Sequence, residues 1–204
     1  MITLYTAATP NGKKASIALA ELGLEYKTQI VHLLKGEQFE ESFLELNPNH
    51  KIPVLEDDGQ VIWESGAILF YLGEKYDTQG IILPDESRLR WQALQLAFFQ
   101  TGGVGPNLGR LGEALQKKGE KNTEMVEIFT REMDRLVGVI ERILSDGRDF
   151  LVGPYSIADI MHYPWLLLAQ EASLPWIAER PTVVSWLDRI GQRPAVQEGM
   201  RGPR

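Results

Sequence analysis

Hydrophobic and polar positions follow two different patterns along this chain, one over the first third and another over the rest. Residues 1–5 and 26–31 are short apolar or alternating runs, which predict two strands. Between them apolar residues recur at helical spacing from Ala15 to Leu22, and Gly23 is typical of a helix end. A strand, a helix and a second strand in this order predict a parallel crossover unit.

The segment 47–67 predicts a turn, a strand, a hairpin turn, a strand and the start of a helix. Its first strand begins at Ile52-Pro53, and the acidic turn 57–59 reverses the chain. The helix that follows is expected over 66–75, with an apolar face that includes Ile68, Leu69 and Leu72. With a short helix before it, this order predicts a small α/β layer similar to a thioredoxin fold.

The rest of the chain predicts helices only. We place a linker at 78–86, between an α/β domain at 1–77 and an all-helical domain at 87–204. The clearest amphipathic helix is expected at 123–144. A last helix is expected at 181–190.

Two further features refine the helical domain. Ser156 and Asp159 have the spacing of a capping box, with Asp in place of the usual Glu, and predict a helix start. The glycine-rich run 102–110 is unfavourable in a helix, at about 1 kcal/mol per glycine relative to alanine. We expect it instead to allow close backbone approach and to form a wall of an interdomain cleft.

Composition and charge exclude several classes of function. The net charge of −7 argues against a nucleic-acid partner. The chain has no cysteine, so a reactive sulfur must come from a ligand. There is no apolar run long enough for a membrane span and no signal peptide, so we expect a cytoplasmic protein. The three histidines are scattered, and we expect no metal site.

The two ends of segment 47–67 could form a ligand site. A cis Ile52-Pro53 bond would leave the backbone of Ile52 free to pair with an extended ligand. Ser65 at a helix N-terminus favours an anion, and Glu64 beside it favours a cation. Together they suit an amino-acid head group. The alternative is a proline that shapes a strand and a serine that only caps a helix.

The turn 9–12, Thr-Pro-Asn-Gly, begins the first predicted helix. Thr9 is a suitable N-cap, and Pro10 suits the first helical position. A thiol held at this helix end would have a lowered pKa, and both Asn11 and Thr9 could donate a hydrogen bond to its anion. The alternative is an ordinary cap and turn.

These segments together resemble the glutathione transferase superfamily, and the turn 9–12 is similar to that of its bacterial nu class of disulfide-bond oxidoreductases. The resemblance covers nearly the whole chain. It implies a glutathione transferase fold, in which a thioredoxin-like domain precedes an all-α domain. It also implies glutathione as cosubstrate and a homodimer. Classes with a catalytic Tyr place it where this chain has Ala7 and Ala8, and we expect Tyr5 to pack.

The resemblance also implies roles for individual residues. The catalytic residues would be Asn11 and Thr9. The γ-glutamyl group would bind Glu64 and Ser65, and the cysteinyl unit would pair with the backbone of Ile52 beside Pro53. The glycyl carboxylate would face Lys51, with His50 as a second candidate, and Asn11 and Gln38 would also contact glutathione.

A second-substrate pocket could be lined by Phe99, Arg110, Arg131 and Trp165. Core or surface positions are the alternative for each. A nu-class arginine that contacts glutathione from the helical domain has no clear counterpart, because Ile128 falls nearest that position.

We therefore expect a glutathione-dependent enzyme that activates the thiol for conjugation or for reduction of a disulfide or peroxide. The alternative is a non-catalytic binding or interaction module of the same fold. A carrier of small hydrophobic ligands is a third possibility.

Overall fold

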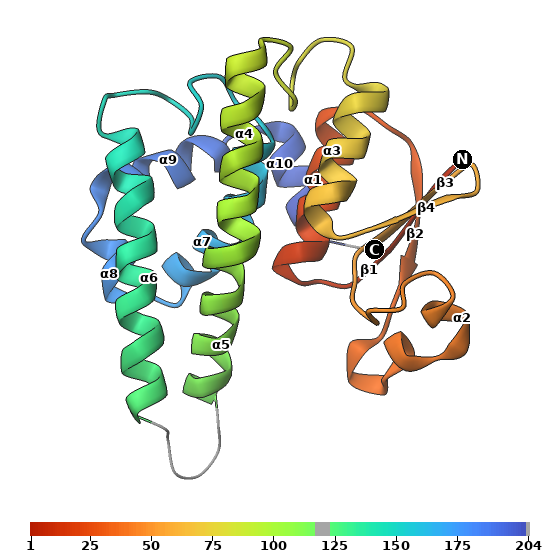
Figure 1. Ribbon diagram of the computed structural model, residues 1–204, viewed down its shortest axis with the longest axis horizontal. Coiled ribbons are helices and arrows are strands. Elements are labelled where there is room, and N and C mark those ends of the chain that lie inside the picture. Colours follow the sequence, from red (N-terminus) through yellow and green to blue (C-terminus); the bar gives the residue numbers. More distant parts are fainter. Residues whose placement is uncertain (117–122, 203–204) are drawn as a thin grey trace. The chain divides into compact units, whose positions relative to one another are not determined.

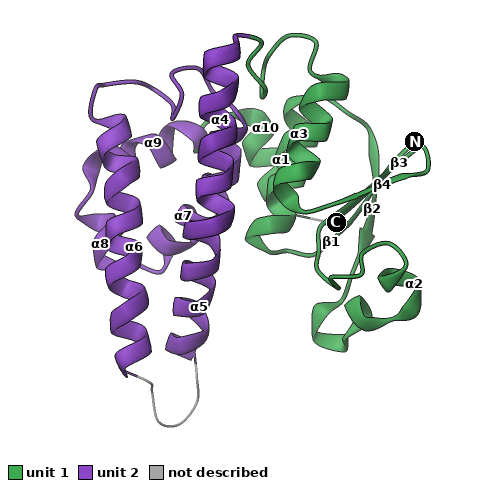
Figure 2. Cartoon of the chain, in the orientation of Figure 1, with its two compact units in different colours: residues 1–85, 191–204 green, residues 86–190 purple. Residues whose placement is uncertain are grey.

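The computed structural model describes residues 1–116 and 123–202. The chain divides into two compact units, one formed by residues 1–85 with 191–204 and the other by residues 86–190 (Figure 2). The first unit is α/β and the second is helical, so the predicted fold class is confirmed. The C-terminal residues, expected in the helical domain, group with the first unit because α10 packs against α1.

A four-stranded mixed sheet forms the centre of the first unit, in the order β2-β1-β3-β4. The strands are β1 (Ile2–Thr6), β2 (Tyr26–Ile30), β3 (Val54–Asp57) and β4 (Gln60–Trp63). β1 and β2 are parallel, whereas β3 runs antiparallel to both β1 and β4. The predicted crossover and hairpin are both confirmed.

Helices α1 (Pro10–Glu21), α3 (Ser65–Tyr76) and α10 (Pro194–Met200) pack together, and α1 and α3 lie beside the sheet in Figure 1. Thr9 caps α1 as predicted, since its hydroxyl accepts a 3.2 Å hydrogen bond from the N–H of Gly12. A Cβ at Gly199 would lie 2.5 Å from the Cα of Ile17. Glycine therefore allows the close contact between α10 and α1.

A short helix, α2 (Glu41–Leu44), follows 3₁₀ turns at Leu33–Lys35 and Glu37–Phe39. Phe43 of this helix is buried against Val31 and Val54. This small apolar cluster fixes the chain that leads into β3.

Asp57 joins the end of β3 to α3. Its Oδ2 accepts hydrogen bonds from Tyr71 at 2.8 Å, Lys75 at 2.7 Å and Tyr76 at 2.6 Å. Burial alone would raise the pKa of Asp57, but these donors lower it to about 2. The cluster holds α3 at a fixed place on the sheet.

The second unit contains helices and one isolated bridge between Phe150 and Gly153 within the described residues. Its elements are α4 (Ser87–Phe99), a π-helical turn (Gln100–Val104), α5 (Gly105–Gln116), α6 (Thr123–Leu144), α7 (Ile157–Glu171), α8 (Pro175–Ala178) and α9 (Pro181–Gly191). The expected helices at 123–144 and 181–190 are confirmed.

The glycine-rich run was expected outside a helix, and this expectation is wrong. It forms the π-helical turn and the start of α5. A Cβ at Gly105 would lie 2.8 Å from the side-chain nitrogen of Gln100, and one at Gly103 would lie 3.2 Å from Leu136. A side chain at either position would displace a neighbouring side chain, so glycine suits this packing despite its low helix propensity.

The expectation that 181–190 is the last helix is also wrong, since α10 begins at Pro194. Proline disrupts a helix interior but suits the first helical position, where its missing N–H has no partner in any case. Arg193 just before it makes a bidentate ion pair with Glu21 of α1, at 2.7 and 2.8 Å.

The predicted capping box at the start of α7 is confirmed. The Ser156 hydroxyl accepts from the N–H of Ala158, and the Asp159 carboxylate accepts from the N–H of Ser156. Asp159 also accepts from the N–H of Leu151 and the indole of Trp186. Burial raises the pKa of Asp159 to about 6, although these donors act in the opposite direction.

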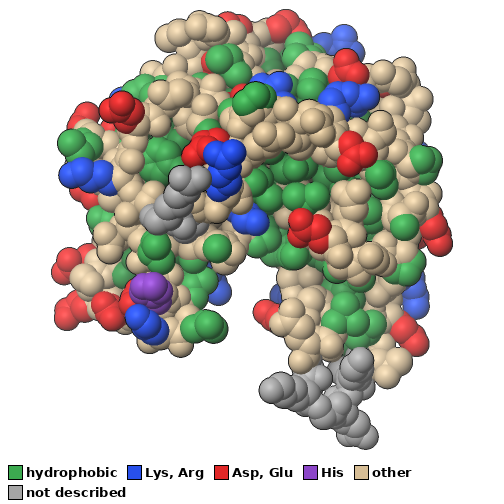
Figure 3. All heavy atoms as spheres, turned by 180° about the vertical axis from the view of Figure 1, so that it is seen from behind, with side chains coloured by type: hydrophobic (Ala, Val, Ile, Leu, Met, Phe, Trp, Pro, Cys, Tyr) green, Lys and Arg blue, Asp and Glu red, His purple; other side chains and the backbone are tan. Residues whose placement is uncertain are grey.

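Two surface properties bear on possible partners. On the face drawn in Figure 3, acidic and basic side chains are interspersed. Among the described residues, no helix is both long enough and apolar enough to cross a membrane.

Candidate functional site

Asn47 organises the loop that leads into β3. Its side chain is buried, and its amide donates a 2.7 Å hydrogen bond to the carbonyl of Lys51. Its side-chain oxygen accepts from the N–H of Asn49 at 2.9 Å, and its carbonyl accepts from the N–H of His50. The loop ends in a cis peptide bond between Ile52 and Pro53, as the family resemblance implies.

Gln38 and His50 come from segments that lie together. The ring of Phe39, next to Gln38, lies 5.1 Å from the His50 ring. The side-chain oxygen of Gln38 is buried without a hydrogen-bond partner among the residues that the structure describes. Such a group is uncommon in native proteins and can mark a ligand contact. Lys51, two residues from Pro53, is exposed.

Glu64 and Ser65 form the N-terminus of α3. Glu64 occupies the cap position with φ 72° and ψ 120°. A positive φ costs a non-glycine residue about 1–3 kcal/mol and is often found at functional sites. Ser65 is the first helical residue and is buried, so the alternative that it is the N-cap is wrong.

Lys14 was not among the predicted site residues. It lies on the buried side of α1 with 1% of its surface exposed, and its ammonium is 3.4 Å from the Ser65 hydroxyl. Burial lowers the pKa of Lys14 to about 7, and the negative charge of Glu64 acts in the opposite direction. No sequence signal marks this residue, because Lys13 beside it is of the same type.

The start of α1 carries the two predicted catalytic residues. Thr9 is the N-cap, and Asn11 is half-buried in the first turn. Tyr5 is not suited to activate a thiol, since its hydroxyl donates to Glu56 at 3.1 Å. Burial is the main effect that raises the pKa of Tyr5, and the hydrogen bond to Glu56 and the negative charge of Glu56 raise it further.

The first unit therefore contains all eight residues predicted to bind or activate glutathione. Lys14 connects the first turns of α1 to the start of α3 through Ser65. An anion could bind to the N–H groups at the helix N-terminus and to the buried ammonium of Lys14. A cation could bind to the carboxylate of Glu64.

The predicted second-substrate residues lie in the second unit. Phe99 is half-buried with its ring 6.0 Å from that of His162, and the guanidinium of Arg110 lies 6.0 Å from the Phe129 ring. Trp165 lies against α5, where a Cβ at Gly109 would be 3.6 Å away.

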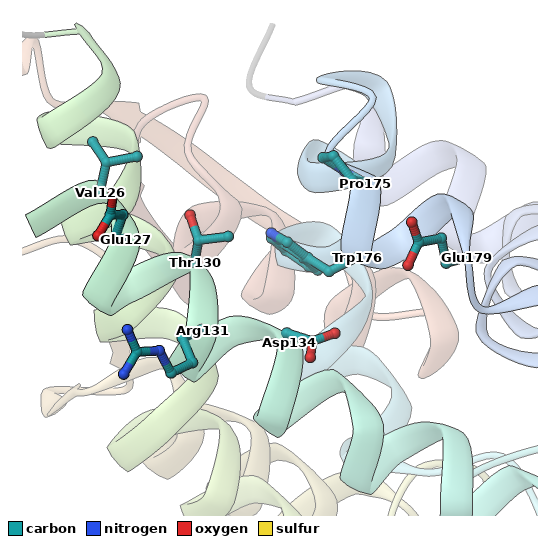
Figure 4. A pocket seen from close by; sticks show the side chains of 8 residues that line it. All are labelled: Val126, Glu127, Thr130, Arg131, Asp134, Pro175, Trp176 and Glu179. Atoms are coloured by element: carbon teal, nitrogen blue, oxygen red, sulfur yellow. The ribbon is translucent and has the colours of Figure 1, made fainter. Parts of the chain in front are cut away.

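Arg131 lines a pocket between α6 and α8 with a volume of about 530 Å³. Figure 4 shows Thr130 and Trp176 turned toward each other in this pocket, whereas the Arg131 side chain points away from Trp176. Of the four predicted second-substrate residues, Arg131 alone lines it. Across residues 1–116 and 123–202, no group of three or more His, Cys, Asp or Glu side chains could hold a metal ion.

Comparison with known proteins extends over both units. Residues 1–74 match the family model "Glutathione S-transferase, N-terminal domain", and residues 89–194 match "Glutathione S-transferase, C-terminal domain". The disulfide-bond oxidoreductase YfcG of Escherichia coli strain K12 is 37% identical, over 98% of this chain and 94% of that protein.

Two solved structures are similar over almost the whole chain. A glutathione transferase family member from Pseudomonas fluorescens with two glutathione bound has a TM-score of 0.91 and 36% identity, covering 99% of this chain and 93% of the other. A glutathione transferase from Pseudomonas putida with one glutathione disulfide bound per subunit has a TM-score of 0.92 and 36% identity, covering 100% and 92%.

Proposed function

Because this chain belongs to the glutathione S-transferase family, we propose that it is a glutathione-dependent enzyme whose preferred reaction is reduction of disulfide bonds. The observation that carries the proposal is the N-terminus of α1, where a thiolate is favoured over a thiol, in a chain that has no cysteine. The sulfur that reacts is then the sulfur of glutathione. The name of the E. coli relative and the glutathione disulfide bound to the P. putida transferase support a disulfide as the second substrate.

In this proposal, the first unit binds glutathione along the loop before β3 and the start of α3. Glu64 pairs with the γ-glutamyl ammonium, and the γ-glutamyl carboxylate lies against Ser65 and the first N–H groups of α3. The backbone of Ile52 pairs with the cysteinyl unit next to Pro53.

Lys51, His50 and Gln38 make the remaining contacts with the tripeptide. Lys51, with His50 nearby, faces the glycyl carboxylate. Gln38 contributes the buried oxygen that lacks a partner in the described residues, and a ligand N–H would satisfy it.

The thiol lies at the N-terminus of α1 in this proposal. There the helix dipole favours the thiolate and lowers the pKa of the thiol. Asn11 donates a hydrogen bond to the anion, and the Thr9 hydroxyl can donate a second one. The enzyme supplies orientation and stabilisation of charge.

The reaction then proceeds by thiol–disulfide exchange. The glutathione thiolate attacks one sulfur of the substrate disulfide, which forms a mixed disulfide and releases the other sulfur as a thiolate. A second glutathione thiolate attacks the glutathione sulfur of the mixed disulfide. The products are glutathione disulfide and the second substrate thiol, and protons from the two glutathione thiols balance the reaction.

The proposal also includes a homodimer and a cytoplasmic location. α4 exposes Trp91 and Phe98, seven residues apart on one face of the helix, with 67% and 68% of their surfaces accessible. A second copy of the chain would cover this face. The cytoplasm is the compartment in which thiols are kept reduced.

Parallel assays with glutathione test the proposal. One measures reduction of hydroxyethyl disulfide, and the other measures conjugation to an aromatic halide. We expect glutathione-dependent reduction of the disulfide at a higher kcat/KM than conjugation. Conjugation without disulfide reduction would overturn the preferred reaction, and inactivity in both assays together with no glutathione binding would favour a non-catalytic module.

A further inference from the structure

Lys14 is one of the largest fully buried side chains of the described residues, with 1% of its surface exposed. Lysine is almost never fully buried unless its charge is paired or used, because removing an ammonium from water costs several kcal/mol. The neighbouring Lys13 on the same helix is partly exposed. The burial of Lys14 therefore needs an explanation in the structure around it.

The contact between Lys14 and Ser65 fixes the direction of a hydrogen bond. A lysine ammonium has three donors and no acceptor, so the 3.4 Å contact makes the Ser65 oxygen the acceptor. The hydroxyl proton of Ser65 is then available to a different acceptor. At this end of α3 the first backbone N–H groups also lack partners within the helix.

The positive charge of Lys14 favours an anion next to Ser65. Glu64, which precedes α3, carries a negative charge that raises the pKa of Lys14, whereas burial lowers it. Glu64 is exposed and sits in a positive-φ conformation at the helix cap. Arg193, just before α10, pairs with Glu21 of α1, and Arg201 pairs with Glu198 at the end of α10.

Building on the proposed function, we propose that Lys14 is a positioning residue of the γ-glutamyl site. It holds Ser65 as a hydrogen-bond donor and places a buried positive charge behind the helix end that receives the ligand carboxylate. Ser65, the α3 N–H groups and Lys14 form one anion site, and the Glu64 carboxylate beside it receives the ligand ammonium.

Binding at this site is linked to protonation of Lys14. With a pKa of about 7, Lys14 is largely neutral in the free protein slightly above neutral pH. A carboxylate bound at Ser65 favours the charged form of Lys14, so the protein takes up a proton when the ligand binds. A lysine with only a packing role would show no such linkage.

Calorimetry with S-methylglutathione measures this linkage, because the probe carries the γ-glutamyl group but has no thiol proton to release. Titrations at pH 7.5 in buffers of different ionisation enthalpy give the number of protons bound. We expect the wild type to take up roughly half a proton or more per ligand. Lys14→Met should lose this uptake and bind the probe roughly tenfold more weakly.

Three matched measurements separate positioning from folding. Lys13→Met, on the same helix, should keep wild-type affinity and proton uptake. Lys14→Arg retains the charge and should recover part of the affinity. A probe with its γ-glutamyl carboxylate converted to an amide should bind the wild type and Lys14→Met equally. Circular dichroism and thermal unfolding verify that each variant is folded.

Each outcome decides between the two proposals. If the wild type binds S-methylglutathione and folded Lys14→Met binds it equally well with the same proton uptake, the role of Lys14 is overturned and the proposed function stands. If Lys14→Met does not fold, absence of proton uptake by the wild type overturns the role of Lys14. If the wild type binds neither S-methylglutathione nor glutathione, the proposed function fails, and this inference fails with it.

Discussion

The first residue of α3 is Ser65, and the proposed γ-glutamyl site depends on its hydroxyl. Ser65→Ala removes one donor to the ligand carboxylate and the acceptor of the Lys14 ammonium. We expect the dissociation constant for glutathione to rise about tenfold, the size of one charge-assisted hydrogen bond. Isothermal titration calorimetry measures the change directly.

Ser87→Ala is a suitable control for this substitution. Ser87 is also the first residue of a helix, α4, and it also follows a glutamate at the cap position. The control variant should bind glutathione as the wild type does. An unchanged dissociation constant for Ser65→Ala would place the γ-glutamyl group elsewhere.

Asn11 is expected to act on the reacting sulfur more than on ligand affinity. Asn11→Ala should lower kcat for disulfide reduction about tenfold to a hundredfold, the effect of losing one donor to a developing anion. The affinity for glutathione should change little, since the peptide contacts remain. Steady-state kinetics and calorimetry together separate the two effects, with Lys13→Ala as the control on the same helix. Wild-type turnover would remove Asn11 from the mechanism.

At the scale of residues, local chemistry could be predicted and burial could not. Thr9 and Pro10 have fixed preferences at a helix start, so the sequence indicates their places. Lys14 is a lysine two positions after a glycine, and it is buried by the packing of α1 against other elements, which include α3 and α10. The orphaned oxygen of Gln38 likewise depends on neighbours that the local sequence does not specify.

At the scale of elements, Asp57 connects β3 to α3 and makes a testable contribution to stability. Asp57→Asn removes a charge that accepts hydrogen bonds from one lysine and two tyrosines. We expect a loss of about 2 kcal/mol in the free energy of unfolding at neutral pH. Denaturant unfolding measures it, with Asp58→Asn in the adjacent exposed turn as a control.

The pH dependence of this contribution follows from the direction of the pKa shift. The pKa of Asp57 is lowered in the folded protein to about 2 from its usual value of 3.8. The stabilisation is therefore fully present above about pH 4 and is lost as the pH falls toward 2. The stability difference between wild type and Asp57→Asn should shrink over this range. A difference that stays constant from pH 6 to pH 2 would contradict the assignment.

Helices with strong local signals could be predicted, and those set by packing could not. The amphipathic pattern of α6 and the capping box of α7 are readable in the sequence. α5 begins in a glycine-rich run that local propensity disfavours, and a Cβ at Gly105 would meet the side-chain nitrogen of Gln100 at 2.8 Å. Pro194 follows the helix expected to be the last, and proline, which disrupts a helix interior, is favourable at the first position of α10.

At the scale of the whole molecule, the exposed face of α4 predicts self-association. Burying Trp91 and Phe98 against a second copy would remove a large aromatic surface from water. We expect light scattering to give twice the 23.0 kDa mass of the chain. Trp91→Glu combined with Phe98→Glu should give a monomer.

Leu168→Glu is a matched control for this double variant. Leu168 is an exposed leucine on α7, with 47% of its surface accessible, and lies outside the proposed interface. The control should remain dimeric. A wild-type protein that stays monomeric at micromolar concentration would contradict the proposed dimer.

The central claim is that a chain without cysteine activates the thiol of a bound ligand. The most direct test is a titration of enzyme-bound glutathione, followed by the ultraviolet absorbance of its thiolate. A free cysteine thiol has a pKa of about 8.5, and the account predicts that the bound thiol titrates at least one pH unit lower. A bound thiol that titrates at the same pH as free glutathione would contradict it.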